Sequence, residues 1–146
     1  MKGEVTGIEK ANEALNAELR KVGKLSERFV TKSLISISAN TAPMVPIDTS
    51  FLLSSEYRKV EKLFDGFVGE IGFGAEYAKW VHEMPGTLKG QPRANFGKTR
   101  EGVEFGGGTG KGNYWDPDAE PQFLAKGVEA FIADDLDALL RQELGE

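Results

Sequence analysis

Cysteine is absent from the 146-residue chain, and histidine occurs once, as His82. The absence of cysteine excludes disulfide bonds, thiolate metal sites and cysteine nucleophiles. A single histidine also excludes a metal centre built from several imidazoles of one chain. Long apolar runs are lacking as well: the longest uncharged stretch, Ser33–Ile47, is rich in Ser, Thr and Asn, whereas a membrane-spanning helix needs about 20 mostly apolar residues. The sequence therefore predicts no metal, no cofactor and no membrane segment.

What the chain does contain is typical of one globular domain. Hydrophobic residues make up 40% and charged residues 28%, with a formal net charge of -5, so we expect residues 1–146 to form a single domain. The charge is unevenly distributed. Residues 89–112 carry five bases and two acids, whereas residues 113–146 carry nine acids and two bases. A basic segment thus precedes an acidic one, and the two can pair within one subunit or between subunits.

A long amphipathic helix is predicted over residues 6–39. Its apolar residues recur every seven positions, at Ile8, Leu15, Val22 and Phe29, which is the spacing of one helix face. Pro43 and Pro46 mark its end. Such a helix spans roughly 50 Å, which is more than the core of so small a domain can cover. We therefore expect part of it to pack on something else.

Two short runs predict an antiparallel hairpin. Residues 67–73 alternate between two faces, and residues 51–60 have strand character, with Phe51, Leu53 and Tyr57 on one face. The intervening Asp65-Gly66 is a turn signal. The change of apolar period, from helical to alternating and back, predicts an α+β fold in which a long N-terminal helix and a C-terminal helix pack on a small antiparallel sheet.

Three further elements are expected after the hairpin. A short helix over 75–83 would pack Tyr77, Trp80 and Val81 on the sheet, and a flexible Gly-rich loop over 85–112 would include a short strand at 103–105. A second long helix over 121–143 follows, because Pro121 is a favoured first-turn residue behind two acids. Its predicted apolar face consists of Leu124, Val128, Phe131, Ile132, Leu136 and Leu139.

The Gly-rich segment does not match a phosphate-binding loop. In Gly106–Gly112 the position of the first required glycine holds Phe105, and Gly112 stands where a Ser or Thr must follow Lys111. The sequence pI of about 5.1 argues against a dedicated nucleic-acid-binding protein. We interpret this segment as a basic contact loop.

Asp48-Thr49-Ser50 resembles the active-site tripeptide of aspartic proteases. Those enzymes need two carboxylates that share a proton, and a small chain supplies the second only as a symmetric dimer. The structural alternative is that Asp48 and Thr49 form a turn between helix and strand. A small dimeric hydrolase that uses Asp48 is therefore an alternative hypothesis, but no catalytic residue is predicted.

Three stretches in order resemble the tail-completion, or head–tail joining, proteins of long-tailed bacteriophages. They are Val45–Ser55, Glu76–Gly86 and Pro121–Val128. The family typically has a Val-Pro-Val-Asp-Thr-Gly-like segment after its long helix, then a Tyr-Ala segment ending in Val-Glu or Val-His-Glu, and a Pro-x-Phe-Leu segment that opens the last helix. Two departures occur: Ser50 replaces the usual glycine, and Leu53 or its neighbour replaces the usual basic residue.

The resemblance implies a non-enzymatic structural protein of the virion neck. It would assemble as a homo-oligomeric ring, such as a hexamer, in the host cytoplasm, and contact the head-connector proteins and the tail-tube or tail-terminator proteins. Genomic DNA would pass through the lumen without specific binding, since an acidic surface repels phosphates. A non-viral ring-forming scaffold subunit is a second alternative.

Subunit contacts are predicted from charge and aromatic residues. We expect the bases Lys89, Arg93, Lys98 and Arg100 to reach acids of a neighbouring subunit, with Asp134, Asp135 and Asp137 as their partners. The aromatic residues Phe96, Tyr114 and Trp115 would anchor this contact, because aromatic side chains and arginine dominate interface energetics.

Overall fold

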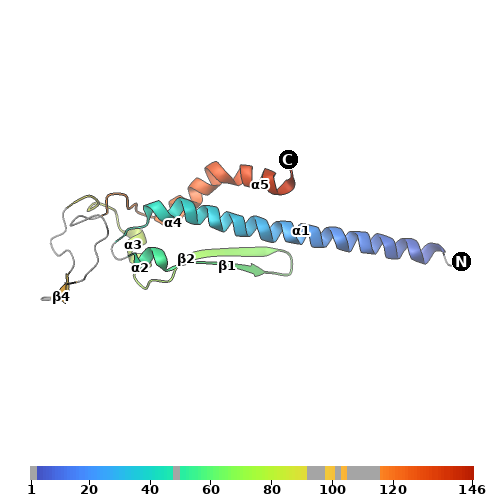
Figure 1. Ribbon diagram of the computed structural model, residues 1–146, viewed down its shortest axis with the longest axis horizontal. Coiled ribbons are helices and arrows are strands. Elements are labelled where there is room, and N and C mark those ends of the chain that lie inside the picture. The colour runs from blue at the N-terminus through green and yellow to red at the C-terminus, as the bar shows by residue number, and fades with distance from the viewer. Residues whose placement is uncertain (1–2, 48–49, 92–97, 101–102, 105–115) are drawn as a thin grey trace.

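The computed structural model describes residues 3–47, 50–91, 98–100, 103–104 and 116–146, and it has the predicted α+β architecture (Figure 1). Helix α1 (Gly3–Thr41) is 39 residues long and is followed by a short 3-10 turn, η1 (Ala42–Met44). The predicted helix and its termination near Pro43 are thus confirmed. At 1.5 Å per residue the helix is about 58 Å long, and it forms the long axis of the molecule (Figure 1).

The hairpin is formed by β1 (Glu56–Lys62) and β2 (Phe67–Phe73), which pair antiparallel from Glu56↔Phe73 to Lys62↔Phe67. The amide of Leu63 donates to the carbonyl of Gly66 over 2.8 Å and closes the turn. The predicted hairpin and its turn are confirmed. The predicted start of the first strand was wrong, because Phe51–Ser54 forms the short helix α2 instead.

One face of the hairpin packs on α1, and Gly69 sets the distance between them. A Cβ at Gly69 would lie 2.7 Å from Cγ1 of Val30 and 3.2 Å from the methyl groups of Leu34. Only a residue without a side chain lets the strand approach the helix this closely. Ile71 and Phe73 share this face, because strand residues two apart point to the same side.

Helix α3 (Ala78–Glu83) confirms the expected short helix but presents a different side to the core. Ala78 is buried and Val81 is half-buried, whereas Trp80 is 73% exposed. The predicted face was wrong for Trp80, whose ring points outward, and for Tyr77, which lies just before the helix and is 43% exposed. In the Gly-rich segment, β3 (Lys98–Arg100) and β4 (Val103–Glu104) form a small antiparallel pair. The remainder of the predicted 85–112 loop, residues 92–97, 101–102 and 105–112, lies outside the described residues.

The C-terminal helix runs through three pieces: α4 (Phe123–Ala130), the π-helical turn η2 (Phe131–Asp135) and α5 (Leu136–Leu144). Its contact stripe follows every fourth residue, since Phe123, Gly127, Phe131 and Glu143 are buried. The predicted face was wrong for Ile132, which is 58% exposed. A four-residue step overshoots the 3.6-residue turn by about 40°. The wider π-turn takes up this drift and keeps the stripe on α1.

Helices α1 and α4 approach each other closely at Gly127. An ideal Cβ there would lie 1.9 Å from Oγ1 of Thr41 and 3.2 Å from the Cα of Thr41. Thr41 is fully buried, and its Oγ1 has no hydrogen-bond partner among the described residues. The side chain of Thr41 therefore packs directly against the backbone of Gly127. It occupies the space that a Cβ at position 127 would need.

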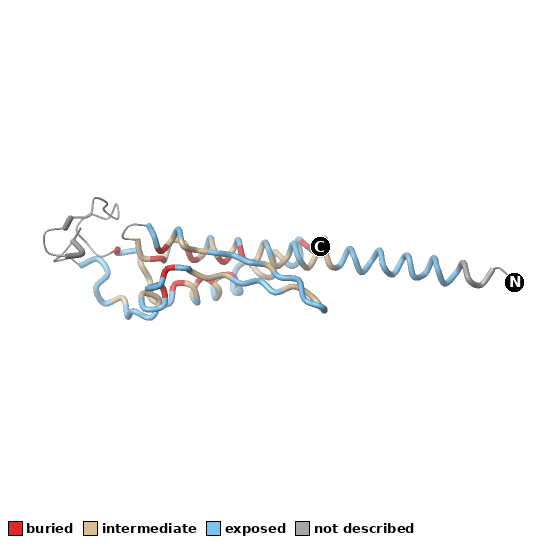
Figure 2. The backbone as a smooth tube through the Cα atoms, turned by 90° about the horizontal axis from the view of Figure 1, so that it is seen from below, coloured by how far each residue is buried: buried red, intermediate tan, exposed pale blue. Residues whose placement is uncertain are grey.

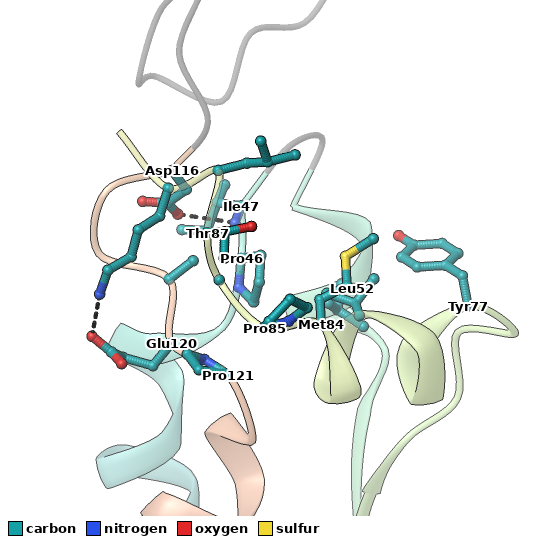
Figure 3. Close-up of a pocket in the computed structure, with 15 residues that line it drawn as sticks. Pro46, Ile47, Leu52, Tyr77, Met84, Pro85, Thr87, Asp116, Glu120 and Pro121 are labelled. Atoms are coloured by element: carbon teal, nitrogen blue, oxygen red, sulfur yellow. Dashed lines mark hydrogen bonds and ion pairs between the residues drawn. The ribbon is translucent and has the colours of Figure 1, made fainter. Parts of the chain in front are cut away.

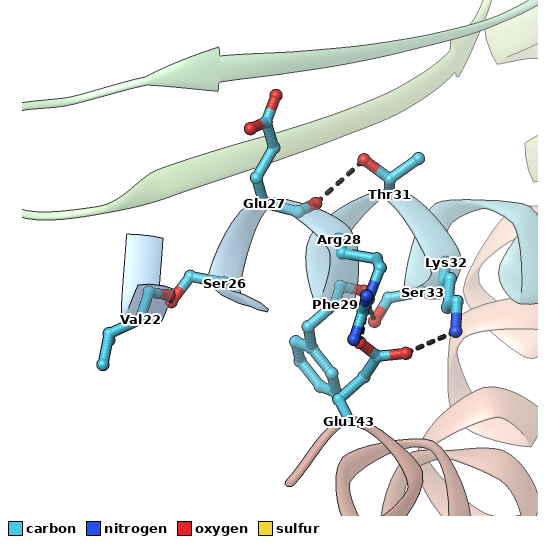
Figure 4. Close-up of polar contacts among 9 residues, drawn as sticks. All are labelled: Val22, Ser26, Glu27, Arg28, Phe29, Thr31, Lys32, Ser33 and Glu143. Atoms are coloured by element: carbon cyan, nitrogen blue, oxygen red, sulfur yellow. Dashed lines mark hydrogen bonds and ion pairs between the residues drawn. The ribbon is translucent and has the colours of Figure 1, made fainter. Parts of the chain in front are cut away.

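Farther along, α5 is held to α1 by a buried carboxylate (Figure 4). The Glu143 side chain is only 4% exposed and accepts hydrogen bonds from Arg28 Nε and Lys32 Nζ of α1. These two bonds, that from Lys32 first, lower the pKa of Glu143 below its ordinary value. Because both oxygens are paired with cations, the carboxylate can be buried in ionised form.

The N-terminal part of α1 extends past both the hairpin turn and the C-terminus (Figure 2). Every residue from 7 to 22 is exposed. We call residues 7–22 the projecting segment.

Candidate functional site: an apolar groove where three motifs meet

The three stretches that carry the family resemblance pack against each other. Val45 and Leu52 from the first, Ala78 from the second and Phe123 from the third belong to one buried cluster, together with Ala75. Phe123 is at the centre, with 1% of its surface exposed. Segments separated by tens of residues thus build one small core at the end of the molecule opposite the N-terminus (Figure 1).

Phe123 is fixed by two edge-to-face ring contacts. Its centroid lies 5.3 Å from the ring of Phe73 and 5.0 Å from the imidazole of His82, at interplanar angles of 89° and 77°. Such T-shaped pairs are preferred by aromatic quadrupoles. His82 Nδ1 also lies 3.0 Å from a carboxylate oxygen of Glu83. The single histidine therefore has a packing role that the sequence did not reveal.

Two residues with left-handed backbone conformations lie just before the helices that contribute Leu52 and Phe123 to this cluster. Ser50, just before α2, has φ 63°, and Gln122, just before α4, has φ 53°. Ser50 is the position at which the resembled family usually has glycine, and the left-handed region is where glycine is favoured. The amide of Gln122 donates to the carbonyl of His82 over 2.8 Å. That bond ties the start of α4 to α3.

Beside the cluster lies an apolar groove of about 360 Å³ (Figure 3). Its walls come from the segment after α1, from α2 and α3, and from the segments that follow α3 and precede α4. Most of the lining is apolar, as in many ligand-binding clefts. The lining residues are Pro46, Ile47, Leu52, Tyr77, Val81, Met84, Pro85, Gly86, Thr87, Leu88, Lys89, Asp116, Ala119, Glu120 and Pro121.

The polar rim of the groove centres on Glu120. Its carboxylate bridges Lys126 Nζ at 2.8 Å and Lys89 Nζ at 2.7 Å. The hydrogen bond from Lys126, followed by that from Lys89, lowers the pKa of Glu120 to about 2. The bridge connects the segment after α3 to the first turn of α4, and this contact was not predicted.

Asp116 holds the other edge of the groove. It is 7% exposed, and its Oδ2 accepts a hydrogen bond from the amide of Ile47 over 3.0 Å. Its Oδ1 accepts from the amide of Asp118 at the same distance. Through these two hydrogen bonds, Asp116 links the segment after α1 to the segment before α4.

The acids predicted for subunit contacts lie on the C-terminal helix and have different surroundings. Asp134 is exposed. Asp135, in the π-turn, accepts hydrogen bonds from Ser36 at 2.6 Å and Asn40 at 2.8 Å, and these two bonds lower its pKa. Asp137 pairs with Arg141 one turn later, at 2.9 Å. Asp135 thus serves the contact between the C-terminal helix and α1.

The bases and aromatics predicted for that contact are only partly described. Lys89 pairs with Glu120 of its own chain. Lys98 and Arg100 lie in β3, but their side chains are outside the described part, and so are Arg93, Phe96, Tyr114 and Trp115 altogether. The pairing of these bases with acids of a neighbouring subunit stays a prediction. Asp48, the candidate of the hydrolase alternative, also lies outside the described residues.

Among the residues that the structure describes, no group of three or more His, Asp or Glu side chains is arranged to hold a metal ion. In the same part of the chain, no helix combines the length and apolarity that a membrane crossing requires. Comparisons of the chain with protein-family models, with curated proteins and with solved structures gave no match.

Proposed function

We propose that the chain is a structural subunit of the neck of a long-tailed bacteriophage, where it joins the head connector to the tail tube as part of a ring. The observation that carries this proposal is the convergence of Val45–Ser55, Glu76–Gly86 and Pro121–Val128 on one buried cluster and one groove. Short motifs that match by chance have no reason to meet in space. The left-handed backbone at Ser50, where the resembled family has glycine, supports the same assignment.

The shape of the molecule supports an assembly role. A projecting helix with exposed apolar residues and an open apolar groove are surfaces that partners cover. In the proposed role, the groove receives an apolar segment of the adjoining connector or tail protein. Met84 is 55% exposed and lines this groove, so it is placed to contact such a segment.

The test begins with the phage genome that carries the gene. With an early stop codon in the gene, we expect filled heads and complete tails that are not joined, counted by negative-stain electron microscopy. Supplying the wild-type chain from a plasmid should restore joined particles. Joined, infectious particles in the absence of the chain would refute the neck assignment.

A matched pair of variants tests the groove. Met84→Asp places a charge in the groove, whereas Val68→Asp places one on the outer face of the hairpin, where Val68 is similarly exposed at 49%. We expect both purified variants to show the wild-type circular dichroism spectrum. Only Met84→Asp should fail to restore joining. Equal restoration by both variants would exclude the groove as the contact surface.

A further inference from the structure

The projecting segment carries a continuous apolar stripe. Ile8, Leu15 and Val22 are 65%, 59% and 56% exposed, and Leu19 beside them is 60% exposed. Residues seven apart lie within about 20° of each other around a helix. The stripe therefore continues along one side of α1 toward Phe29, which is half-buried. The same side of the helix is covered at one end of α1 and bare at the other.

Further exposed apolar residues border the bare length of α1. In the hairpin turn Phe64 is fully exposed and Leu63 is 45% exposed, and Leu144 at the end of α5 is 62% exposed. Figures 1 and 2 both place the hairpin turn and the C-terminus at the same level along α1, where the projecting segment begins. Single exposed apolar residues are ordinary. An exposed apolar stripe that begins beside an apolar hairpin turn and an apolar end of α5 indicates an interface.

We infer that a second copy of this chain covers the projecting segment, with the two α1 helices packed antiparallel and Leu15 near the two-fold axis. In this arrangement Ile8 of each copy lies opposite Val22 of the other. The seven-residue spacing is that of helices that pair along their length. The inference concerns the free subunit and does not depend on the neck assignment.

Steric room favours the antiparallel orientation. The hairpin and α5 both flank α1 beyond the projecting segment (Figure 1). Two copies paired in parallel would bring their hairpins and C-terminal helices together at the same end of the pair. Antiparallel pairing places the two domain bodies at opposite ends and leaves only helix against helix between them.

Charge favours the same orientation. The first half of the segment carries Glu9 and Glu13 against one base, Lys10. Around its second half lie Arg20, Lys21 and Lys24 against one acid, Glu18. Antiparallel pairing sets the acidic half of each helix along the basic half of the other, whereas parallel pairing sets like charges side by side. Such charges contribute mainly to orientation and partner choice.

Cysteine cross-linking tests the pairing directly, because the chain has no cysteine of its own. Under mild oxidation we expect Leu15→Cys to form a cross-linked dimer, since a residue on the two-fold axis meets itself. Ile8→Cys alone should stay uncross-linked but should join Val22→Cys when the two variants are mixed. Ile35→Cys is the control, because Ile35 is 51% exposed on the same helix outside the segment, and it should not cross-link.

Analytical ultracentrifugation gives an independent measurement. The wild-type chain and Ile35→Glu should sediment with the mass of two chains, and Leu15→Glu with the mass of one chain at unchanged helicity. A wild-type mass of one chain at every concentration tested would overturn the inference. Cross-linking of Ile8→Cys with itself would overturn it too, because that result requires parallel helices.

Discussion

Gly127→Ala tests the close contact between α1 and α4. In an open helix interior, alanine is more favourable than glycine by about 1 kcal/mol. At position 127 the added methyl group would lie 1.9 Å from Thr41 Oγ1, 3.0 Å from its Cβ and 3.2 Å from its Cα. Thr41 is fully buried, and rotation of its side chain leaves its Cβ and Cα at these short distances. The helices α1 and α4 must separate instead.

The magnitude follows from these two opposing terms. Overpacking a close contact costs typically about 1–3 kcal/mol, and the helix preference of alanine offsets about 1 kcal/mol of this. We expect a net loss of up to about 2 kcal/mol in the free energy of unfolding. In a domain of this size a loss of about 2 kcal/mol corresponds to a melting temperature lower by roughly 4–8 °C.

Gly23→Ala is the matched control in the same assay, thermal melting followed by circular dichroism. Gly23 lies inside α1, and a Cβ there would meet nothing within 4 Å. The same substitution should therefore raise the melting temperature at position 23 and lower it at position 127. Thr41→Ala removes the colliding hydroxyl, so the double variant with Gly127→Ala should lose less than the sum of the two single variants. A Gly127→Ala melting temperature at or above that of the wild type would refute the close approach of α1 and α4.

Three further predictions concern the turn before α2, the groove rim and the sheet face. Ser50→Gly should stabilise the fold by about 1 kcal/mol and raise the melting temperature, because glycine adopts the left-handed conformation of this position without strain. A free energy of unfolding lower than that of the wild type in a chemical denaturation series would contradict this prediction. The folded-state pKa of Glu120, about 2, lies below its ordinary value of 4.5, so its contribution to stability is fully present above about pH 4.5 and is lost as the pH falls through 2. The melting temperature of Glu120→Gln should therefore fall less steeply between pH 5 and 2 than that of the wild type, and identical slopes would show that Lys89 and Lys126 do not hold the carboxylate. Ile71→Asp should abolish cooperative melting, because it places an unpaired charge on the sheet face that packs on α1; a melting curve close to the wild-type one would argue against that face.

The sequence predicted those elements whose signal is local. The seven-residue apolar spacing of α1, the alternation in β2 and the turn at Asp65-Gly66 each depend on neighbouring residues alone, and the structure has all three. Where local signals compete, the prediction was wrong. Phe51–Ser54 reads as a strand by side-chain type but forms α2, because Ser50 turns the chain just before it and Leu52 is buried in the cluster around Phe123.

The candidate site could be predicted only in part. The resemblance singled out the stretches that build the groove, although nothing in their spacing says that they meet. The ion pairs that hold the groove and the helices were missed, since Glu120 with Lys89 and Glu143 with Arg28 join residues 31 and 115 positions apart. No sequence pattern marks such partners in a chain rich in both kinds of charge.

By itself, the sequence determined the long N-terminal helix, the hairpin with its turn, and that this helix is too long for its own domain. Periodicity encodes these properties, because a helix or a strand repeats its environment every few residues. Only the tertiary structure decided which side of each helix is buried, that Thr41 packs against Gly127, and which part of α1 is exposed to solvent. Those outcomes depend on backbones that approach each other from distant parts of the chain, and the distance between two helices is set by the side chains that both of them bring to the contact.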